Sequence, residues 1–318
     1  MDYFLGVDGG GSNTRFVLTD AKGGPLLVKH FGPSNIQEVE AGELATTFNA
    51  ALSEMASFVN GGAVKSAFFG IAGITSESDK QFMLNLVGSH PLLKKGKVEA
   101  DHDVRIALAG GLTGRPGIAL IAGTGSSCYG RNERNISHRC GGWGSLADDI
   151  GSGGWIGVRA LQIAVRQADG REPETQLLGL VKEFLQLKSM DDFLNRVHRQ
   201  GLSRPHRALL APLVIQSANE GDGAAKSIIE EAVAGLSELV FTCGCKLKMI
   251  SPEVVFVGGL TKAPYFSTLL ESALKQRHQN VSLSEPELTP AAGSVLIALK
   301  NEGITADPPI LHNLKQID

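Results

Sequence analysis

The sequence predicts an α/β protein with two domains, and three observations lead to this. Two glycine-rich turns, Gly9–Gly11 and Gly123–Gly125, each follow a short apolar run typical of a buried strand, and they lie in different halves of the chain. Predicted strands and helices alternate through the first half, which is typical of an α/β layer with mixed strands. At 318 residues the chain also exceeds the length that one hydrophobic core usually serves.

The first half begins with a strand hairpin and continues as alternating helices and strands. Gly114-Arg115-Pro116-Gly117 combines several chain breakers just before the second glycine-rich turn. We therefore expect the N-terminal domain to span 1–115 and the C-terminal domain 116–290. Within the first, strands are predicted at 3–8, 14–20, 25–30, 67–72 and 97–100, and helices at 43–58, 78–87 and 104–109.

The second half opens with a second hairpin and then becomes mostly helical. Its first strand ends at Ala122, and Cys128-Tyr129 belongs to the partner strand. The tail, 302–318, is expected to be draped over the surface or frayed. Helices are predicted at 153–167, 174–184, 190–199, 204–220, 223–248, 265–276 and 291–301, with a buried strand at 253–257.

The two turns are predicted to form a duplicated phosphate clamp. Consecutive glycines let backbone N–H groups approach an anion closely, and serine and threonine add hydroxyl donors. The first turn carries Asp8 at the end of its strand, where the second has Ala122. A carboxylate there repels phosphate unless a cation lies between them, so Asp8 is predicted to bind Mg²⁺ through water. An ordinary hairpin with a turn aspartate is the alternative.

Asp103 is a candidate general base. It lies where a strand gives way to a helix, and a carboxylate at the carboxyl end of a strand projects into the crevice where α/β proteins bind ligands. There it could accept a proton from an alcohol that attacks a phosphoryl group. A helix N-cap is the competing role, and either Asp101 or Asp103 could fill it. Spacing alone does not separate the two aspartates.

The segment Gly141–Trp155 is predicted to line a ligand site. It combines glycines, two tryptophans and the adjacent carboxylates Asp148 and Asp149, a composition poorly suited to a core strand. Carboxylates bind sugar hydroxyls through charge-assisted hydrogen bonds, and glycines let backbone groups reach a sugar ring. A glycine-rich loop in which Asp149 caps the following helix is the alternative. Gly258-Gly259, after the strand at 253–257, would allow a flat ligand such as adenine to approach.

Composition and charge exclude several classes of function. The net charge of −3 and the pI near 6.3 give no sign of the basic surface that nucleic-acid-binding proteins carry. No apolar stretch approaches the length of a bilayer span, and the N-terminus lacks a signal peptide, so we expect a cytoplasmic enzyme without a membrane partner. Four cysteines do not make a disulfide framework in a chain this long. Cys243 and Cys245 lie in an apolar helical run and favour core packing over a metal site.

Taken together, the motifs resemble the bacterial and animal N-acetylglucosamine kinases. These belong to the BadF/BadG/BcrA/BcrD-type ATPases, which also include activators of benzoyl-CoA reductase and 2-hydroxyacyl-CoA dehydratase, within the sugar-kinase, heat-shock-chaperone and actin superfamily. The resemblance covers nearly the whole chain. It is carried by 6–14, 32–35, Asp103, 123–126, 141–144, Asp149, 151–152 and 218–222.

The resemblance implies two actin-like (ribonuclease H-like) domains around a central cleft for ATP and sugar, with helix 291–301 returning to the first domain. It implies MgATP-dependent phosphorylation of an amino sugar at its 6-hydroxyl, with Asp103 as the base. N-acetylglucosamine is the first expected substrate and glucosamine the alternative; a homodimer is left open. The nucleotide residues would be Gly10, Gly11, Ser12, Asn13, Thr14, Thr124, Ala218, Gly258 and Gly259, and the sugar residues Asn35, Asp103, Gly125, Ser127, Gly142, Trp143, Gly144 and Asp149.

The chain departs from the family pattern beside the expected sugar site. Asp148-Asp149-Ile150-Gly151-Ser152 stands where Gly-Asp-Glu-Gly-Ser is usual, and Ser127 stands where the animal kinases have asparagine. An ATPase that activates a dehydratase or reductase is the alternative from another class. That role needs cysteines that bridge an iron–sulfur cluster across a dimer, and Cys243 and Cys245 match it poorly.

Overall fold

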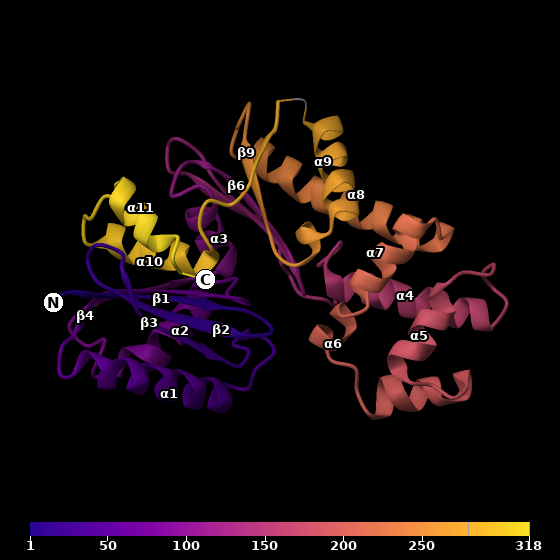
Figure 1. Cartoon of the computed structure of the whole chain (residues 1–318), viewed down its shortest axis with the longest axis horizontal. Helices are drawn as coiled ribbons and strands as arrows, with labels where there is room; N and C mark the ends of the chain where they lie inside the picture. Colours follow the sequence, from indigo (N-terminus) through magenta and orange to yellow (C-terminus); the bar gives the residue numbers. More distant parts are fainter. Residues whose placement is uncertain (279, 318) are drawn as a thin grey trace.

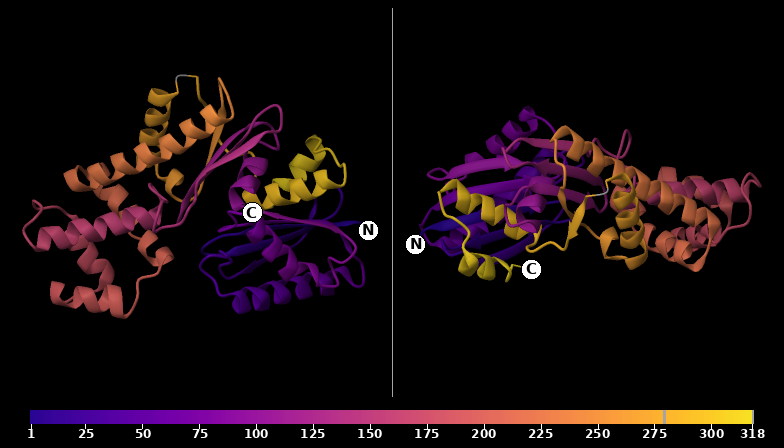
Figure 2. Two further views of the ribbon diagram at one scale, coloured as in Figure 1. Left: turned by 180° about the vertical axis from the view of Figure 1, so that it is seen from behind. Right: turned by 90° about the horizontal axis from the view of Figure 1, so that it is seen from above.

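The computed structural model describes residues 1–278 and 280–317, and these form two lobes, each built on a five-stranded mixed sheet (Figure 1). The first sheet has the order β3-β2-β1-β4-β5 and the second the order β10-β9-β6-β7-β8. The views from behind and from above show both chain ends on the lobe of the first sheet (Figure 2). The predicted α/β class is confirmed.

The first sheet carries helices on both faces. Successive side chains along its strands point to opposite faces, and both faces are apolar. It consists of β1 (Tyr3–Gly9), β2 (Thr14–Thr19), β3 (Pro25–Phe31), β4 (Val64–Ile71) and β5 (Lys97–Asp101). Leu5, Phe16 and Phe69 pack with α1 (Ala41–Val59) and α2 (Glu77–Gly88). Phe4 and Phe68 point to the opposite face, against α10 (Pro290–Asn301).

The second sheet repeats the connectivity of the first. Strand β6 (Gly117–Ala122) is antiparallel to β7 (Ser126–Arg131) and parallel to β9 (Glu253–Val257), as β1 is antiparallel to β2 and parallel to β4. The outer strands β8 (Ser137–Gly141) and β10 (Ser282–Ser284) complete the sheet. Each glycine-rich turn therefore connects the central strand to its antiparallel neighbour at the same place in its own sheet.

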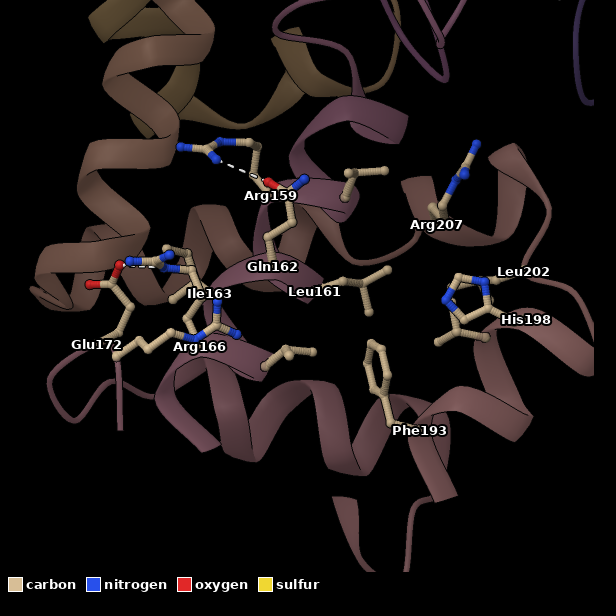
Figure 3. A pocket seen from close by; sticks show the side chains of 14 residues that line it. Arg159, Leu161, Gln162, Ile163, Arg166, Glu172, Phe193, His198, Leu202 and Arg207 are labelled. Carbon is tan, nitrogen blue, oxygen red and sulfur yellow. Dashed lines mark hydrogen bonds and ion pairs between the residues drawn. The ribbon is translucent and has the colours of Figure 1, made fainter. Parts of the chain in front are cut away.

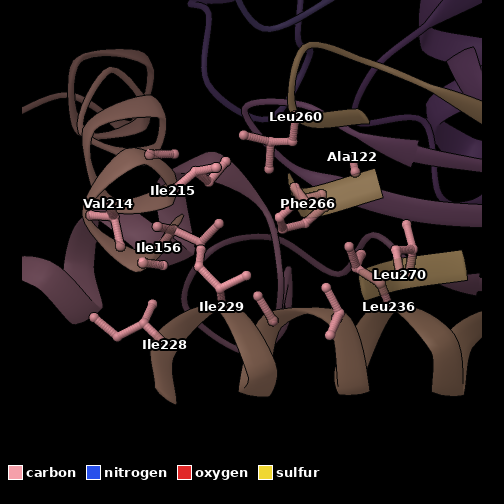
Figure 4. Packing of buried hydrophobic residues seen from close by; sticks show 14 of the residues in the cluster. Ala122, Ile156, Val214, Ile215, Ile228, Ile229, Leu236, Leu260, Phe266 and Leu270 are labelled. Atoms are coloured by element: carbon pink, nitrogen blue, oxygen red, sulfur yellow. The ribbon is translucent and has the colours of Figure 1, made fainter. Parts of the chain in front are cut away.

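Helices make up most of the second lobe. They are α4 (Gly153–Ala168), α5 (Leu177–Leu185), α6 (Arg204–Ala208), α7 (Ala211–Glu220), α8 (Gly223–Lys246) and α9 (Pro264–Arg277), with short helical segments η1 (Met190–Asp192), η2 (Asn195–Arg199) and η3 (Leu260–Lys262). A cavity is lined by α4 and η2 (Figure 3). In the core, Phe266 and Leu260 gather with Ala122, Ile156 and Ile229 (Figure 4).

Helix α3 (Asp103–Gly111) lies between the lobes. Val104 and Leu108 pack against Ala119 and Val255 of the second sheet, while Ile106 faces α10. The two helices approach so closely that a Cβ added at Gly293 would lie 2.1 Å from the carbonyl oxygen of Ile106. The return of α10 to the first sheet, which the resemblance implied, is therefore observed, in contact with β1, β4 and α3.

Several predicted elements differ from the observed ones. The helix predicted at 204–220 is divided into α6 and α7, because Pro212 cannot continue a preceding helix. The helix predicted at 190–199 consists of η1 and η2, and β8 and β10 were not predicted. The tail is not frayed: it forms α11 (Pro308–Leu314), whose Ile310 and Leu314 are buried against α10. No helix in residues 1–278 or 280–317 has the length and apolar character that a bilayer crossing requires.

Candidate active site

A cleft of about 510 Å³ lies between the lobes, and both glycine-rich turns line it. The hydroxyl oxygens of Ser12 and Thr124, one from each turn, are 3.5 Å apart. Sequence-predicted residues that line the cleft are Asp8, Gly10, Gly11, Ser12, Asn13, Asn35, Asp103, Thr124, Gly125, Ser127, Gly142, Trp143, Gly144, Asp149 and Gly258. The fold thus brings together residues that are widely separated in the sequence.

The first turn is closed by its own backbone and leaves free space around Gly11. The N–H of Gly10 donates to the carbonyl of Asn13 over 2.8 Å. A Cβ added at Gly11 would meet no atom within 4 Å, so packing inside the protein does not explain this glycine. Open space at a backbone N–H is what an approaching anion requires.

The second turn is held by the start of α4. The N–H groups of Gly153 and Gly154 donate to the carbonyls of Gly123 and Thr124, over 2.8 and 3.1 Å. Ser152, and not Asp149, caps this helix by accepting a hydrogen bond from the Trp155 N–H. The alternative in which Asp149 is a helix cap is therefore wrong.

Asp8, in β1, and Asp103, at the start of α3, face the same cleft. Burial and the Asp103 carboxylate raise the pKa of Asp8 to about 7, against a lowering effect of Arg15. Burial also raises the pKa of Asp103 to about 6, although the N–H of Val104 donates to its carboxylate over 2.9 Å and lowers it. Among the described residues neither carboxylate has a salt-bridge partner within the usual 4 Å. Such unneutralised carboxylates are typical of groups that act on a ligand.

The structure separates Asp101 from Asp103. Asp101 accepts from Arg105 over 2.7 Å and lies 3.3 Å from the ammonium of Lys80. Burial raises the pKa of Asp101, but His102 and Arg105 outweigh it and hold that pKa below the ordinary value. The cap of α3 is neither aspartate but His102, whose Nδ1 accepts from the Arg105 N–H over 3.1 Å. Asp101 is thus engaged inside the protein, while Asp103 is available to a ligand.

Asp149 is buried and paired with Arg204 of α6. The same guanidinium reaches Glu38 in the first lobe, 2.6 Å away. Burial raises the pKa of Asp149, and Arg204 opposes that rise. The backbone of Asp149 is left-handed, with φ of 62°, a conformation that costs energy for a residue with a side chain and clusters at functional sites.

Arg139 and Trp143 form the outer part of the cleft. The Arg139 guanidinium lies 4.9 Å from the centre of the Trp143 ring, and its Nη1 donates to the carbonyl of Gly142 over 3.4 Å. Trp143 is 68% exposed, which leaves its other face open. Arg139 has no salt bridge with any residue in the described ranges, so its charge is free to meet a ligand.

Three predicted site residues do not line the cleft. Thr14 is fully buried, and its hydroxyl donates to the carbonyl of Gly32 over 2.7 Å. It therefore stabilises the first glycine-rich turn from inside the protein. Ala218 is buried in α7, and Gly259 lies beside the lining residue Gly258. These three positions therefore lie outside the lining of the cleft.

Three comparisons with known proteins place the chain in a family. Residues 5–298 match the model of the BadF/BadG/BcrA/BcrD ATPase family. The chain belongs to this family. An N-acetylmuramic acid/N-acetylglucosamine kinase of Clostridium acetobutylicum is 33% identical over 94% of this chain and 98% of its own. An N-acetyl-D-glucosamine kinase of Dictyostelium discoideum is 28% identical over 95% of this chain and 99% of its own. Among solved structures, a candidate N-acetylglucosamine kinase from Chromobacterium violaceum has a TM-score of 0.74 and 25% identity, over 94% of this chain and 99% of that one.

Arg139 and Arg204 line the cleft but were not identified as site residues in the sequence, and the same holds for Glu38 and His102. In this ATPase-family protein, Arg204 comes from a segment that was predicted to be one long helix. A buried carboxylate such as Asp149 requires a cationic partner, and this requirement could have indicated that an arginine or lysine lies in the site. The sequence offers many arginines, however, and only the fold selects Arg204.

The cysteines give no sign of a metal centre. Cys128 and Cys140 face each other across β7 and β8, and Cys243 is buried beneath β8, while Cys245 is exposed on α8. The expected core packing therefore holds for Cys243 and not for Cys245. No group of three or more histidine, cysteine, aspartate or glutamate side chains within 1–278 and 280–317 is arranged to hold a metal ion.

Proposed function

We propose that this protein transfers the γ-phosphoryl group of ATP to the 6-hydroxyl of an amino sugar, with N-acetylglucosamine as the first substrate. The observation that carries the proposal is Asp103, a partly buried carboxylate with a raised pKa that faces a cleft lined by the two glycine-rich turns. Membership of an ATPase family supports the use of ATP. The names of the two kinase relatives support the amino sugar.

In this proposal, residues at one end of the cleft bind the phosphates of ATP and residues at the other end bind the sugar. Backbone N–H groups of Gly11–Asn13 and the Thr124 hydroxyl bind the phosphates, one turn from each lobe. Asn35, Asp149 and the backbone of Gly142 hold sugar hydroxyls. Asp103 accepts the proton of the attacking hydroxyl, and a pKa near 6 leaves it ionised at neutral pH yet basic enough to take a proton.

Asp8 fits the binding of Mg²⁺. Its carboxylate is partly buried and has no hydrogen-bond partner among the described residues, and desolvation raises its pKa to about 7 when no cation is beside it. Magnesium prefers carboxylate oxygen and water as ligands. Bound there with ATP, the ion would neutralise charge on the phosphates, and Asp8 would hold it directly or through water.

A panel of sugars tests the proposal. Purified protein with MgATP is assayed for ADP release with N-acetylglucosamine, glucosamine and glucose, and the phosphorylated carbon is assigned by nuclear magnetic resonance. We expect phosphate on the 6-oxygen of N-acetylglucosamine. No amino sugar raising ADP release above the sugar-free rate would refute the kinase function.

The position of Arg139 favours a second sugar substrate, one that carries a carboxylate. N-acetylmuramic acid differs from N-acetylglucosamine by an acidic lactyl ether, and Arg139 offers an unpaired guanidinium beside Trp143 at the outer part of the cleft. Arginine binds carboxylates with two parallel hydrogen bonds. We therefore expect activity toward N-acetylmuramic acid, and Arg139→Met to raise KM for that sugar about tenfold more than for N-acetylglucosamine. Equal effects on both sugars would exclude this role.

A further inference from the structure

A second cavity, larger than the cleft, lies in the helical part of the second lobe. It has a volume of about 760 Å³ between α4, η2 and the end of α6, and none of its lining residues lines the cleft. In the close-up, Leu161 of α4 faces Phe193 and His198, with Arg166 and Glu172 toward the opposite side (Figure 3). Small-molecule sites usually have volumes of about 300–1,000 Å³.

The lining of this cavity combines apolar side chains with positive charge. Its apolar part consists of Leu161, Ile163, Phe193, Val197 and Leu202. Four arginines line it against one acidic residue, Glu172, in a chain whose net charge is −3. A lining of this kind matches a molecule with an apolar body and an anionic head.

One of the four arginines is free. Arg166 pairs with Glu172 over 2.7 Å, Arg159 with Glu231 over 3.1 Å, and Arg171 with Asp169. Arg207 of α6 has no salt bridge with any residue in the described part of the chain, and its Nε is buried without an acceptor. The Nε of Arg159 is buried and unpaired as well. Leaving a buried donor unsatisfied costs free energy, which an anion bound in the cavity would recover.

We propose that this cavity is a second binding site, for an amphipathic organic anion with one phosphate, sulfonate or carboxylate head. The head meets Arg207, and the apolar body lies between Leu161 and Phe193. The site is separate from the proposed kinase reaction and does not depend on it.

The cavity is connected to the cleft through α6. Arg207 lines the cavity, and Arg204, three residues earlier in the same short helix, holds Asp149 and Glu38. Helix α6 is packed against α4 so tightly that a Cβ at Gly157 would lie 2.1 Å from the carbonyl oxygen of Arg207. The first residues of α4 in turn hold the second phosphate turn. A ligand that draws Arg207 inward therefore acts on both the sugar end and the phosphate end of the cleft.

Fluorescence tests the site without any activity measurement. The chain has two tryptophans, and Trp143→Phe leaves only Trp155, whose ring is 5.7 Å from the Arg159 guanidinium carbon. The probe is 8-anilinonaphthalene-1-sulfonate, an apolar aromatic sulfonate whose bound form accepts energy from tryptophan. We expect saturable quenching of Trp155 with one probe per chain, reversed by octyl phosphate. Octanol and inorganic phosphate, which each supply only half of the required chemistry, should displace the probe at least tenfold less well.

Two variants and a matched control decide whether the probe occupies this cavity. In the Trp143→Phe background, Arg207→Met should weaken probe binding at least tenfold, and Val197→Phe should weaken it by filling space while all charges remain. Arg134→Met removes an exposed arginine outside the cavity and should change nothing. Equal probe affinity in Arg207→Met and Arg134→Met, or displacement by octanol as good as by octyl phosphate, would overturn the proposal. Circular dichroism verifies that each variant is folded.

The connection to the cleft has its own readout, which rests on the proposed function. Saturating octyl phosphate should change KM for N-acetylglucosamine at least twofold in the unaltered protein and not in Arg207→Met. An unchanged KM in the unaltered protein would refute the connection alone. Absence of any kinase activity would instead refute the proposed function, while the fluorescence titration would still decide the cavity.

Discussion

Arg204 and Glu38 form a salt bridge across the cleft, with Nη1 of the guanidinium 2.6 Å from Oε1 of the carboxylate. Arg204 belongs to the second lobe, and Glu38 follows β3 in the first. The same guanidinium is paired with the buried Asp149. One side chain therefore connects the two lobes at the end of the cleft where we propose that sugar binds.

Domain closure is the first prediction. Substrates that touch both lobes should draw them together and exclude water, which competes with the sugar hydroxyl for the phosphoryl group. The expected hinges are Gly114–Gly117 and the segment before Ala291. We expect N-acetylglucosamine to alter the fluorescence of Trp143, and sugar with a non-hydrolysable ATP analogue to reduce the radius of gyration in solution scattering. A scattering profile unchanged at saturating ligand would argue against closure.

Glu38→Gln should affect the unliganded protein most. It removes one partner of Arg204 and leaves Asp149 in place, so the two lobes lose a direct connection while the proposed sugar contacts remain. We expect a larger radius of gyration without ligand, and a smaller difference from the unaltered protein once both substrates are bound. Glu77→Gln, on an exposed surface of α2, provides the control. Identical scattering of the Glu38 and Glu77 variants without ligand would mean that the salt bridge does not set the opening.

Asp103→Asn should lower kcat by roughly 10²–10⁴, the range for loss of a general base, with sugar and ATP affinity largely kept. Asp101→Asn is the matched control two residues away. It removes a partner of Arg105 and Lys80 and should reduce the melting temperature, with a far smaller effect on kcat per folded molecule. Steady-state kinetics with both variants measures the difference. Equal losses of kcat would mean that the base was assigned wrongly.

The pH dependence of kcat/KM for the sugar follows from the raised pKa of Asp103 in the unliganded protein. A general base must be ionised, and a pKa of about 6 means that the ionised fraction falls as the pH drops through that value. We expect kcat/KM for the sugar to be constant above about pH 7 and to fall about tenfold for each pH unit well below 6. A profile that is flat down to pH 5, in a protein that remains folded there, would contradict this role of Asp103.

Asp149→Ala should act on sugar binding. The loss of a charged acceptor in a closed site costs about 1.5–3 kcal/mol, which corresponds to roughly a ten- to hundredfold increase in KM for the sugar. ATP affinity should change little, because the glycine-rich turns remain. The substitution also deprives the mostly buried Arg204 of a partner, so Asp149→Asn, which keeps the shape, should show a smaller effect. A normal KM for sugar in both variants would remove Asp149 from the site.

Local signals predicted much of the fold and of the cleft. Apolar strands before Gly9 and Gly123, and the breakers at Gly114–Gly117, identified two related halves, and the structure has the same connectivity in both sheets. These signals are local because turn formation depends on backbone freedom at a few adjacent residues. The helix predicted at 204–220 shows where such local signals fail. The apolar spacing of a helix continues through Pro212, but a proline cannot continue the hydrogen bonding of the preceding helix, so the helix is split.

The sequence by itself predicted that Asp8, Asp103, Thr124 and Asp149 belong to the site, and all four line the cleft, whereas the arginines of the cleft were not predicted. Only the tertiary structure decided their partners. The engagement of Asp101 by Arg105 and Lys80, the pairing of Asp149 with Arg204, and the free charges of Arg139 and Arg207 depend on contacts between segments far apart in the chain. The physical reason is that charge interactions and burial act through space: they depend on distance and on exclusion of water, and residue order fixes neither until the chain has packed.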